Sequence, residues 1–281
     1  MEATLITSDA NERVKRWRKL AAQPRAIRKE GACLAEGLHL AMSARDAGIA
    51  PAAVLLRDGP RDPESERLAR QLLALASDQG QRPRAYLLSP AVYESIAPVE
   101  NGAGIMLEIP VREPRAPARL AGEDVLYLDG VQDAGNAGTL IRTAVASGVR
   151  VIAASPRTAC LWSPKVLRSA MGAHFGAEII ENLPADEMAR LFQGRKLAAD
   201  ARGGSDIYLT EGWEKGPTVW LMGAEGPGLS AAALEAADMR LYIPIESATE
   251  SLNVGAAAAV CLFEQKRRRL LASAARRNES K

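Results

Sequence analysis

The fold is decided by residues 125–154, which read VLYLDGVQDAGNAGTLIRTAVASGVRVIAA. The apolar run Val125–Leu128 predicts a strand, and a helix is expected over about residues 137–147. Gly148 stands at the C-cap position of that helix, and Val149–Ala154 is expected to be the next strand. Strands that are apolar throughout, rather than alternating, are typical of a parallel sheet with helices on both faces. The stretch therefore predicts an α/β fold built from strand–helix–strand units.

The same pattern continues towards the C-terminus. A long helix is expected over Leu252–Leu271, apolar almost all round until Phe263 and basic beyond it. Its first half has the composition of a helix packed within one domain or against a second copy of the chain. Further apolar runs predict four more strands, at Ala177–Ile180, Lys196–Ala199, Thr218–Met222 and Leu241–Ile245.

The N-terminal third predicts a smaller α/β unit. Asp9 and Glu12 have the spacing of a capping box, so a first helix is expected to run to about Leu20. After it comes an apolar run at 32–35. Helices are expected near 38–47, 65–76 and 91–96, and strands at 53–56, 86–88 and 105–109.

A proline-rich stretch separates this unit from the rest of the chain. Pro110, Pro114 and Pro117 stand close together with charged residues between them, and proline stiffens a chain into an extended form. The expected organisation is an N-terminal domain over 1–111, a linker over 112–121 and a C-terminal domain over 122–281.

Composition excludes several classes of protein. With 281 residues, 47% of them hydrophobic and 25% charged, the chain has the usage of a soluble globular protein. No apolar run approaches the roughly 20 residues of a membrane span, and residues 1–18 have no signal-peptide core. The three cysteines are far apart and there are only two histidines, so we expect no metal site and a reduced, cytoplasmic setting.

Basic residues are concentrated near both ends of the chain. Residues 13–29 contain eight basic and no acidic side chains, and a second basic cluster occupies 266–269. Such clusters are typical of proteins that bind a phosphate backbone, although a solvated helix face has the same composition. As RNA-binding candidates we take Arg13, Arg16, Lys19 and Arg28.

Three loops at predicted strand ends carry residues suited to binding and chemistry. They contain Asn136-x-Gly138-x-x-x-Arg142-Thr143, Gly223-x-Glu225-Gly226-x-Gly228-Leu229, and Ile243-Pro244 followed by Ser251-Leu252-Asn253-Val254. Parallel α/β sheets bind ligands outside the carboxyl ends of their strands. Each loop alone has a plain structural explanation: the asparagines and serine as helix caps, the glycines as turns, the arginine as a surface ion-pair partner.

Together, in this order and spacing, the loops resemble the TrmH/SpoU RNA 2′-O-methyltransferases of the SPOUT superfamily. Pro164-Lys165-Val166 and the segment 168–173 also look like the family's sequence after its first motif. Ile6-Thr7-Ser8 and Glu36-Gly37 are similar, less specifically, to the family's ribosomal-protein-like substrate-binding domain. Departures are Ala134 and Ala137, where proline and leucine are frequent, and Ser247, where glycine is usual and where a side chain could narrow the cofactor loop.

The resemblance implies a fold, a cofactor and an assembly. The fold would be a SPOUT-type parallel sheet with a deep trefoil knot, which acts as a homodimer through its C-terminal domain. The methyl donor would be S-adenosylmethionine, with no metal. Cofactor-binding positions would be Gly223, Glu225, Gly228, Ile243, Leu252 and Asn253, and the catalytic positions Arg142, Asn136, Ser251 and Asn253.

The reaction implied is methylation of a ribose 2′-hydroxyl in RNA, and we favour ribosomal over transfer RNA. Because the pKa of arginine exceeds about 12, Arg142 is expected to stabilise charge or position a phosphate rather than abstract a proton. Two alternatives are an inactive RNA-binding protein that keeps the fold and a metabolic enzyme on a nucleotide-binding sheet. An inactive copy should have lost Arg142 or Asn253, and both are present.

Overall fold

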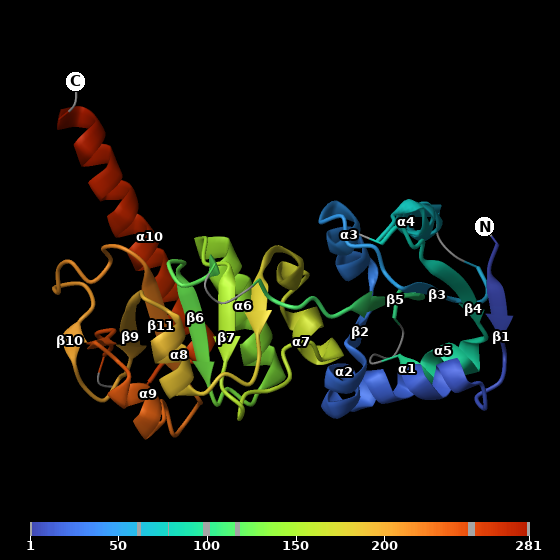
Figure 1. The fold of residues 1–281 in the computed structure, drawn as a ribbon, viewed down its shortest axis with the longest axis horizontal. Coiled ribbons are helices and arrows are strands. Elements are labelled where there is room, and N and C mark those ends of the chain that lie inside the picture. Colours follow the sequence, from blue (N-terminus) through green and yellow to red (C-terminus); the bar gives the residue numbers. More distant parts are fainter. Residues whose placement is uncertain are drawn as a thin grey trace. The chain divides into compact units, whose positions relative to one another are not determined.

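The computed structural model describes residues 2–60, 63–77, 79–97, 102–115, 119–246 and 251–279. It divides into two compact units, each with its own sheet (Figure 1). The first unit contains Met1–Glu113 and Trp162–Phe175, and the second contains Pro114–Leu161 and Gly176–Lys281. The passage from the first unit to the second after Glu113 falls in the expected linker region, of which residues 116–118 lie outside the described residues. Ser247 also lies outside them.

The first unit is built on a mixed five-stranded sheet with the order β1-β4-β3-β5-β2. β1, β4 and β3 are parallel, whereas β5 is antiparallel to both of its neighbours. The strands are β1 (Thr4–Ile6), β2 (Ala32–Glu36), β3 (Ala53–Arg57), β4 (Arg84–Leu88) and β5 (Ile105–Pro110). The three expected strands are present as β3, β4 and β5, and the apolar run 32–35 forms β2. The short strand β1 was not expected.

Five helices of the N-terminal segment accompany this sheet: α1 (Glu12–Ala22), α2 (Pro24–Glu30), α3 (Leu38–Asp46), α4 (Pro63–Ala74) and α5 (Pro90–Ile96). The predicted capping box of α1 is wrong. Asn11 is the N-cap and accepts a hydrogen bond from the backbone N–H of Arg13 at 2.9 Å. Asp9 instead pairs with Arg18 at 3.0 Å, because its carboxylate reaches the exposed face of the helix.

A segment from the second half of the chain belongs to the first unit. Helix α7 (Pro164–Ser169) packs on β2, and Gly172, which follows it, lies against Ser43. A Cβ on Gly172 would stand 2.4 Å from the Cβ of Ser43, and its φ of +82° also favours glycine. The boundary between the two units is therefore crossed by the chain three times, whereas the sequence predicted a single crossing.

The second unit contains a seven-stranded sheet with the order β10-β12-β9-β11-β6-β7-β8. Every strand pair in it is parallel, which confirms the fold class expected from the apolar runs. The strands are β6 (Val125–Asp129), β7 (Val151–Ala154), β8 (Glu178–Ile180), β9 (Arg195–Ala199), β10 (Ser205–Asp206), β11 (Thr218–Gly223) and β12 (Met239–Tyr242). The order runs in opposite directions on the two sides of β6, so that β6 and β11 are neighbours at a topological switch point.

Helices cover both faces of this sheet: α6 (Ala134–Ser147), α8 (Ala185–Leu191), α9 (Ala231–Glu235) and α10 (Val254–Glu279) (Figure 1). Val219 and Leu221 of β11 pack in one core with residues of α8 and α9. Trp220 points to the opposite face, because side chains alternate along a strand, and its indole N–H donates to Gln265 of α10 at 2.6 Å. α10 in turn packs along α6.

Two arginines of the basic cluster on α10 donate their hydrogen bonds to acceptors within the protein. Arg268 donates to the backbone carbonyls of Ile207, Tyr208 and Thr210 at 2.6–2.7 Å and lies over the ring of Trp213. Arg269 donates to the carbonyls of Glu214 and Gly216 and to the carboxylate of Asp124. The two arginines hold the loop over 207–216 against α10. They therefore do not present a free phosphate-binding surface, which was one of the two interpretations of this basic cluster.

Glu264, which pairs with Arg267 and Arg268, should make the contact between α10 and the loop over 207–216 sensitive to acid. Hydrogen bonds from Arg267 and Arg268 lower the pKa of the nearly buried Glu264 carboxyl to about 2. A carboxyl whose pKa is depressed on folding stabilises the protein above its unfolded pKa of about 4.3 and loses this contribution as the pH falls towards 2. Because solvent screens the pair with the exposed Arg267, we expect Glu264 to contribute about 2 kcal/mol to the free energy of unfolding at neutral pH.

Urea unfolding of the wild type and Glu264→Gln at pH 7 and pH 3 measures this contribution. The two proteins should differ clearly in unfolding free energy at pH 7 and by less at pH 3. An equal difference at both values would show that Glu264 does not titrate as described.

Candidate functional site

The three motif loops meet at the carboxyl edge of the second unit's sheet. β6 and β11 pair in register up to Asp129 and Gly223, so the first and second loops leave the sheet side by side. The carboxylate of Asp129 joins them, since it is buried and accepts a hydrogen bond from the backbone N–H of Ser230 at 2.7 Å. The third loop follows β12. A strand was expected over 241–245, but β12 ends at Tyr242, so Ile243 belongs to the loop.

The second motif forms a tight loop. Ala224 and Gly228 exchange two backbone hydrogen bonds of 3.1 and 2.9 Å, and Gly226 and Gly228 turn the chain with φ values of +81° and +73°. Gly223 lies so close to this loop that a Cβ on it would stand 2.3 Å from the carbonyl carbon of Gly228 and from the N of Leu229. The glycines of the motif therefore allow the close approach of two backbone segments.

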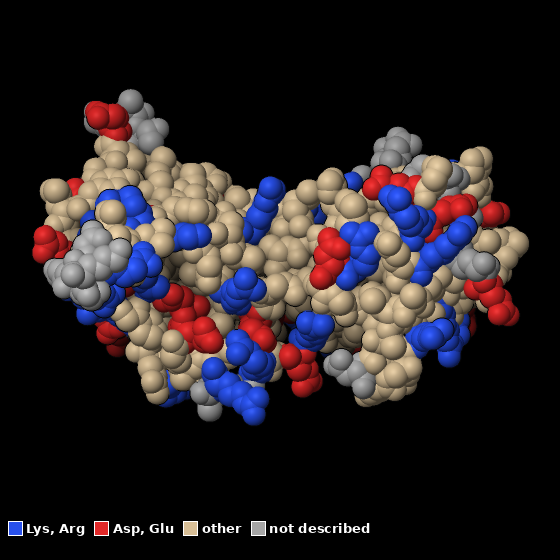
Figure 2. Space-filling view, turned by 90° about the horizontal axis from the view of Figure 1, so that it is seen from above, with Lys and Arg blue, Asp and Glu red and all other residues tan. Residues whose placement is uncertain are grey.

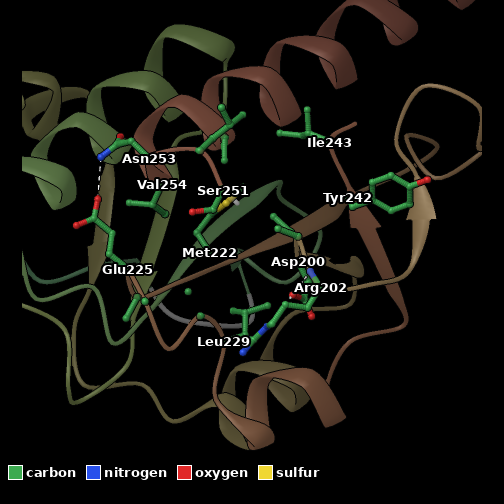
Figure 3. Close-up of a pocket in the computed structure, with 18 of the residues that line it drawn as sticks. Asp200, Arg202, Met222, Glu225, Leu229, Tyr242, Ile243, Ser251, Asn253 and Val254 are labelled. Atoms are coloured by element: carbon green, nitrogen blue, oxygen red, sulfur yellow. Dashed lines mark hydrogen bonds and ion pairs between the residues drawn. The ribbon is translucent and has the colours of Figure 1, made fainter. Parts of the chain in front are cut away.

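A cavity of about 550 Å³ lies where the second and third loops meet (Figure 3). This size falls in the range of about 300–1,000 Å³ that is usual for small-molecule sites. Strand-end backbone, glycines and apolar side chains make up most of the wall. All six positions that the sequence assigned to the cofactor line it, together with Ser251: Gly223, Glu225, Gly228, Ile243, Leu252 and Asn253.

One residue from each motif joins a hydrogen-bonded triad beside this cavity. Asn136 donates its side-chain amide to Glu225 Oε1 at 2.7 Å, and Asn253 donates to the same oxygen at 2.8 Å. Asn253 also donates to Asn136 Oδ1 at 3.0 Å. Figure 3 shows the bond between Asn253 and Glu225 at the edge of the cavity. The structure therefore brings together three residues of which the first and last, Asn136 and Asn253, are 117 positions apart in the sequence.

Helix capping explains only part of these asparagines. The N-cap of α6 is Asp133, whose carboxylate accepts from the backbone N–H of Asn136, so the Asn136 side chain does not cap the helix. Asn253 does both: its Oδ1 accepts from the N–H groups of Gly255 and Ala256 at the start of α10, and its amide group joins the triad. Asn253 thus anchors α10 to the motif cluster.

A second cavity of about 560 Å³ adjoins the first on the other side of the second motif's loop. Asn136, Gln132 and Arg157 line it, and Glu225 and Gly228 line both cavities. The triad of Asn136, Glu225 and Asn253 therefore stands between two spaces, which suits a reaction between two bound molecules.

Arg142 lies further along α6 than Asn136 and lines neither cavity. Its side chain is exposed, and within the described part of the chain it has no hydrogen bond or ion pair. The explanation of Arg142 as one half of a surface ion pair is therefore not supported. Within the described residues the Arg142 guanidinium is therefore available to an anionic ligand.

Asp200 and Arg202 are residues of the cavity that the sequence did not single out. They follow β9, which lies between β11 and β12 in the sheet. Burial raises the pKa of the Asp200 carboxyl, but hydrogen bonds from Arg202 and Arg240 outweigh burial, so the pKa is lowered overall. The rule that ligands bind at strand carboxyl ends would have found them, because strand 196–199 was expected and Asp200 is the next residue.

The predicted RNA-binding residues of α1 and α2 differ in their surroundings. Arg13 and Lys19 are exposed, with the Arg13 guanidinium 5.3 Å from the ring centre of Tyr86, and Arg28 is also exposed. Arg16 has an internal role, because it pairs with Glu30 and, at 2.8 Å, with the buried Glu108. Figure 2 shows Lys and Arg side chains on the surface of both units, interspersed with acidic ones.

Among the residues that the structure describes, no group of three or more His, Cys, Asp and Glu side chains is arranged to hold a metal ion. Within those same ranges, no helix is long and apolar enough to cross a membrane.

Comparison with known proteins gives a consistent result over nearly the whole chain. The SpoU rRNA Methylase family profile matches residues 124–263, and that of the MRM3-like substrate binding domain matches residues 11–106. The chain is 33% identical to the 23S rRNA (guanosine(2553)-2′-O)-methyltransferase RlmP of Bacillus subtilis, covering 92% of this chain and 97% of that protein. It is 32% identical to the 23S rRNA (guanosine-2′-O-)-methyltransferase RlmB of Pseudomonas aeruginosa, covering 76% and 87%.

A solved structure agrees with these relatives. The AdoMet-bound rRNA methyltransferase from Sinorhizobium meliloti superposes with a TM-score of 0.79 at 28% identity, covering 95% of this chain and 98% of that one. The agreement therefore extends over both units. On these matches, and with the motif residues gathered at one sheet edge, the chain belongs to the SpoU rRNA methylase family.

Proposed function

We propose that this protein transfers a methyl group from S-adenosylmethionine to a ribose 2′-hydroxyl of ribosomal RNA. The observation that carries the proposal is the triad of Asn136, Glu225 and Asn253, which joins all three family motifs between two cavities. The preference for ribosomal over transfer RNA is supported by the names of the relatives, which act on 23S rRNA.

The first cavity is the proposed cofactor site. Backbone groups of Gly223, Ile243 and Leu252 are proposed to bind the adenine and the ribose, which they can do without crowding from side chains. The proximity of Gly223 to Gly228 supports this fit, since any larger residue at 223 would push the end of β11 away from the second motif's loop. S-adenosylmethionine, when bound, supplies an electrophilic methyl group on a sulfonium. Glu225 and Gly228 then separate this cavity from the space proposed for the RNA nucleotide.

The protein's part in the reaction is to align the attacking oxygen and to compensate charge. Alignment alone can supply a large part of a barrier reduction. Asn136, Ser251 and Asn253 are proposed to shape the site, and Arg142 to hold the phosphate next to the acceptor ribose and to stabilise the alkoxide as it forms. Its permanent positive charge suits stabilisation and not proton abstraction.

Three further properties are part of the proposal. The C-terminal domain is proposed to contain the trefoil knot of the family. Two copies are proposed to pair through the C-terminal domain, where Phe263, Leu270 and Leu271 on α10 are large apolar side chains exposed to solvent. A cytoplasmic location follows from the proposed ribosomal RNA substrate and fits three buried cysteines.

An inactive RNA-binding protein is the alternative. Such a protein would not need the hydrogen-bonded triad that joins the three motifs. The geometry therefore favours an active enzyme.

Mapping 2′-O-methylation in total RNA from a strain that lacks the protein tests the function. We expect a ribosomal RNA position to lose its methyl group and to regain it with the wild type, but not with Arg142→Ala. Loss confined to a transfer RNA would overturn the choice of substrate. Unchanged methylation throughout, with stable expression in the parent, would overturn the activity.

RNA affinity should depend on the exposed cations of α1. Arg13→Ala/Lys19→Ala should weaken RNA binding and lower the slope of log K against log salt by about 1.5, because two fewer counterions are released. Arg16 is left intact, since its removal would strip the buried Glu108 of a partner. Filter binding between 50 and about 200 mM salt gives the slope.

The matched control removes two exposed arginines from another helix of the same unit. Arg67→Ala/Arg70→Ala on α4 changes the net charge by the same amount. If both double variants lose affinity equally, α1 contributes only through net charge and is not a specific RNA contact.

A further inference from the structure

Arg202 is oriented into the proposed cofactor cavity by a buried carboxylate. Asp200 is 4% exposed, and its Oδ1 accepts from the backbone N–H of Arg202 at 3.1 Å and from Arg202 Nε at 3.3 Å. Its Oδ2 accepts from Arg240 Nη2 at 2.6 Å. Both carboxylate oxygens are thus bound, and the guanidinium of Arg202 is held by its Nε edge (Figure 3 shows both side chains on the cavity wall).

The outer end of the Arg202 guanidinium lies against the second motif's loop. A Cβ on Gly228 would stand 2.5 Å from Arg202 Nη2 and 3.2 Å from Cζ. Glycine at this position therefore leaves room for the arginine as well as providing the positive φ. Nη1 and Nη2 make no hydrogen bond or ion pair within the described residues, so up to four N–H donors of this planar group remain for a ligand.

The charges of the cavity indicate which ligand group these donors meet. Among the residues that the structure describes, the charged side chains that line it are Asp200, Arg202 and Glu225. Asp200 is already neutralised by two arginines, and Glu225 Oε1 faces the triad. S-adenosylmethionine has one anionic group, the α-carboxylate, and a guanidinium edge with two parallel donors matches a carboxylate in a bidentate pair.

We propose that Arg202 binds the α-carboxylate of the methionyl group of S-adenosylmethionine, with Asp200 as the positioning residue. The proposal rests on the proposed function. It adds a cofactor contact from a loop outside the three motifs, and it makes the methionyl group, and not only the adenosine, a source of affinity.

Calorimetric binding of two adenosine ligands to the full-length protein tests this assignment. S-adenosylhomocysteine carries the carboxylate, whereas 5′-methylthioadenosine lacks it and keeps the adenosine and sulfur. The wild type should prefer the first. Arg202→Gln should weaken S-adenosylhomocysteine binding on the order of 10- to 100-fold, the usual effect of losing a charge-assisted pair, and change 5′-methylthioadenosine binding less than about twofold.

Two companion variants sharpen the result. Asp200→Asn should cause a smaller loss of affinity that is again confined to S-adenosylhomocysteine, because Asp200 acts through Arg202. If Asp200 only supported the fold, its replacement would weaken the binding of both ligands alike. Arg190→Gln removes an exposed arginine of the same unit on α8 and should change neither affinity. Thermal melts of all variants establish that each is folded at the temperature of the binding measurement.

The contradicting outcomes are distinct. Equal losses for both ligands in Arg202→Gln would place Arg202 against the adenosine and overturn the assignment. Unchanged affinity for both, with weaker RNA binding, would assign Arg202 to an RNA phosphate instead. Failure of the wild type to bind S-adenosylhomocysteine at all would overturn the proposed function along with this inference.

Discussion

Arg142→Ala and Arg142→Lys should each reduce single-turnover methyl transfer by about 100-fold or more at saturating cofactor and RNA. Removing one preorganised donor from a site of developing negative charge typically costs on the order of 10²–10³-fold. Lysine should not rescue the reaction, because a single ammonium cannot bind a phosphate and an alkoxide through a planar fork. Cofactor affinity should stay near that of the wild type, since Arg142 does not line the cofactor cavity.

The structure makes this test cleaner than the sequence alone would. Because Arg142 is exposed and has no ion pair within the described residues, its removal should change the unfolding free energy by less than about 1 kcal/mol. A rate effect can therefore be attributed to the reaction. Arg190→Ala, which removes an exposed arginine from α8, is the matched control and should keep full activity. Near-normal turnover in Arg142→Ala would remove Arg142 from the site.

Elements with long, continuous patterns were predictable from the sequence. Strands β6, β7 and β11 are apolar over four or more residues, since helices cover both faces of the sheet. The structure places these strands and β9 within a residue or two of the expected bounds. Strand β1 was missed because only Ile6 of its three residues is buried, which leaves no apolar run. α2 was missed because seven residues with one buried side chain show no helical period.

The surroundings of charged residues were less predictable than those of apolar residues, because a sequence shows a cation but not the group that accepts its hydrogen bonds. Arg268 and Arg269 looked like part of an exposed basic cluster, and in the structure backbone carbonyls from a loop about 50 to 60 residues earlier surround them. Arg16 likewise finds Glu108, which is 92 residues away. Conversely, Arg142 could have been a surface ion-pair partner, and within the described residues it has none.

The candidate site was predictable as a set of positions but not as an arrangement. The family resemblance named the residues of the three loops, and all the expected cofactor positions line one cavity. Nothing in the spacing could show that Asn136 and Asn253 share an oxygen of Glu225, because that contact depends on how β6 and β11 pair and where α10 begins. Asp200 and Arg202 escaped notice because they belong to no motif, although they follow a predicted strand.

Gly223→Ala should abolish most cofactor binding, because it places a methyl group inside packed backbone. Its Cβ would lie 2.3 Å from two backbone atoms and 2.6 Å from the carbonyl oxygen of Gly228. Backbone cannot rotate aside as a side chain can, so the end of β11 and the second motif's loop must separate. Overpacking of this kind costs about 1–3 kcal/mol, and the separation also displaces Glu225 and the cavity wall. We expect at least a tenfold loss of S-adenosylhomocysteine affinity and a lower Tm.

The other glycines of the loop provide graded controls that separate steric from conformational effects. Gly226→Ala meets no atom within 4 Å, so only its φ of +81° opposes the change, and its affinity should fall least. Gly228→Ala combines φ +73° with a clash against the flexible end of Arg202, and should lie between the two. The affinity for S-adenosylhomocysteine should therefore be highest in Gly226→Ala, intermediate in Gly228→Ala and lowest in Gly223→Ala. If Gly223→Ala binds S-adenosylhomocysteine as tightly as Gly226→Ala, the close approach of β11 and the loop is not what shapes the cofactor site.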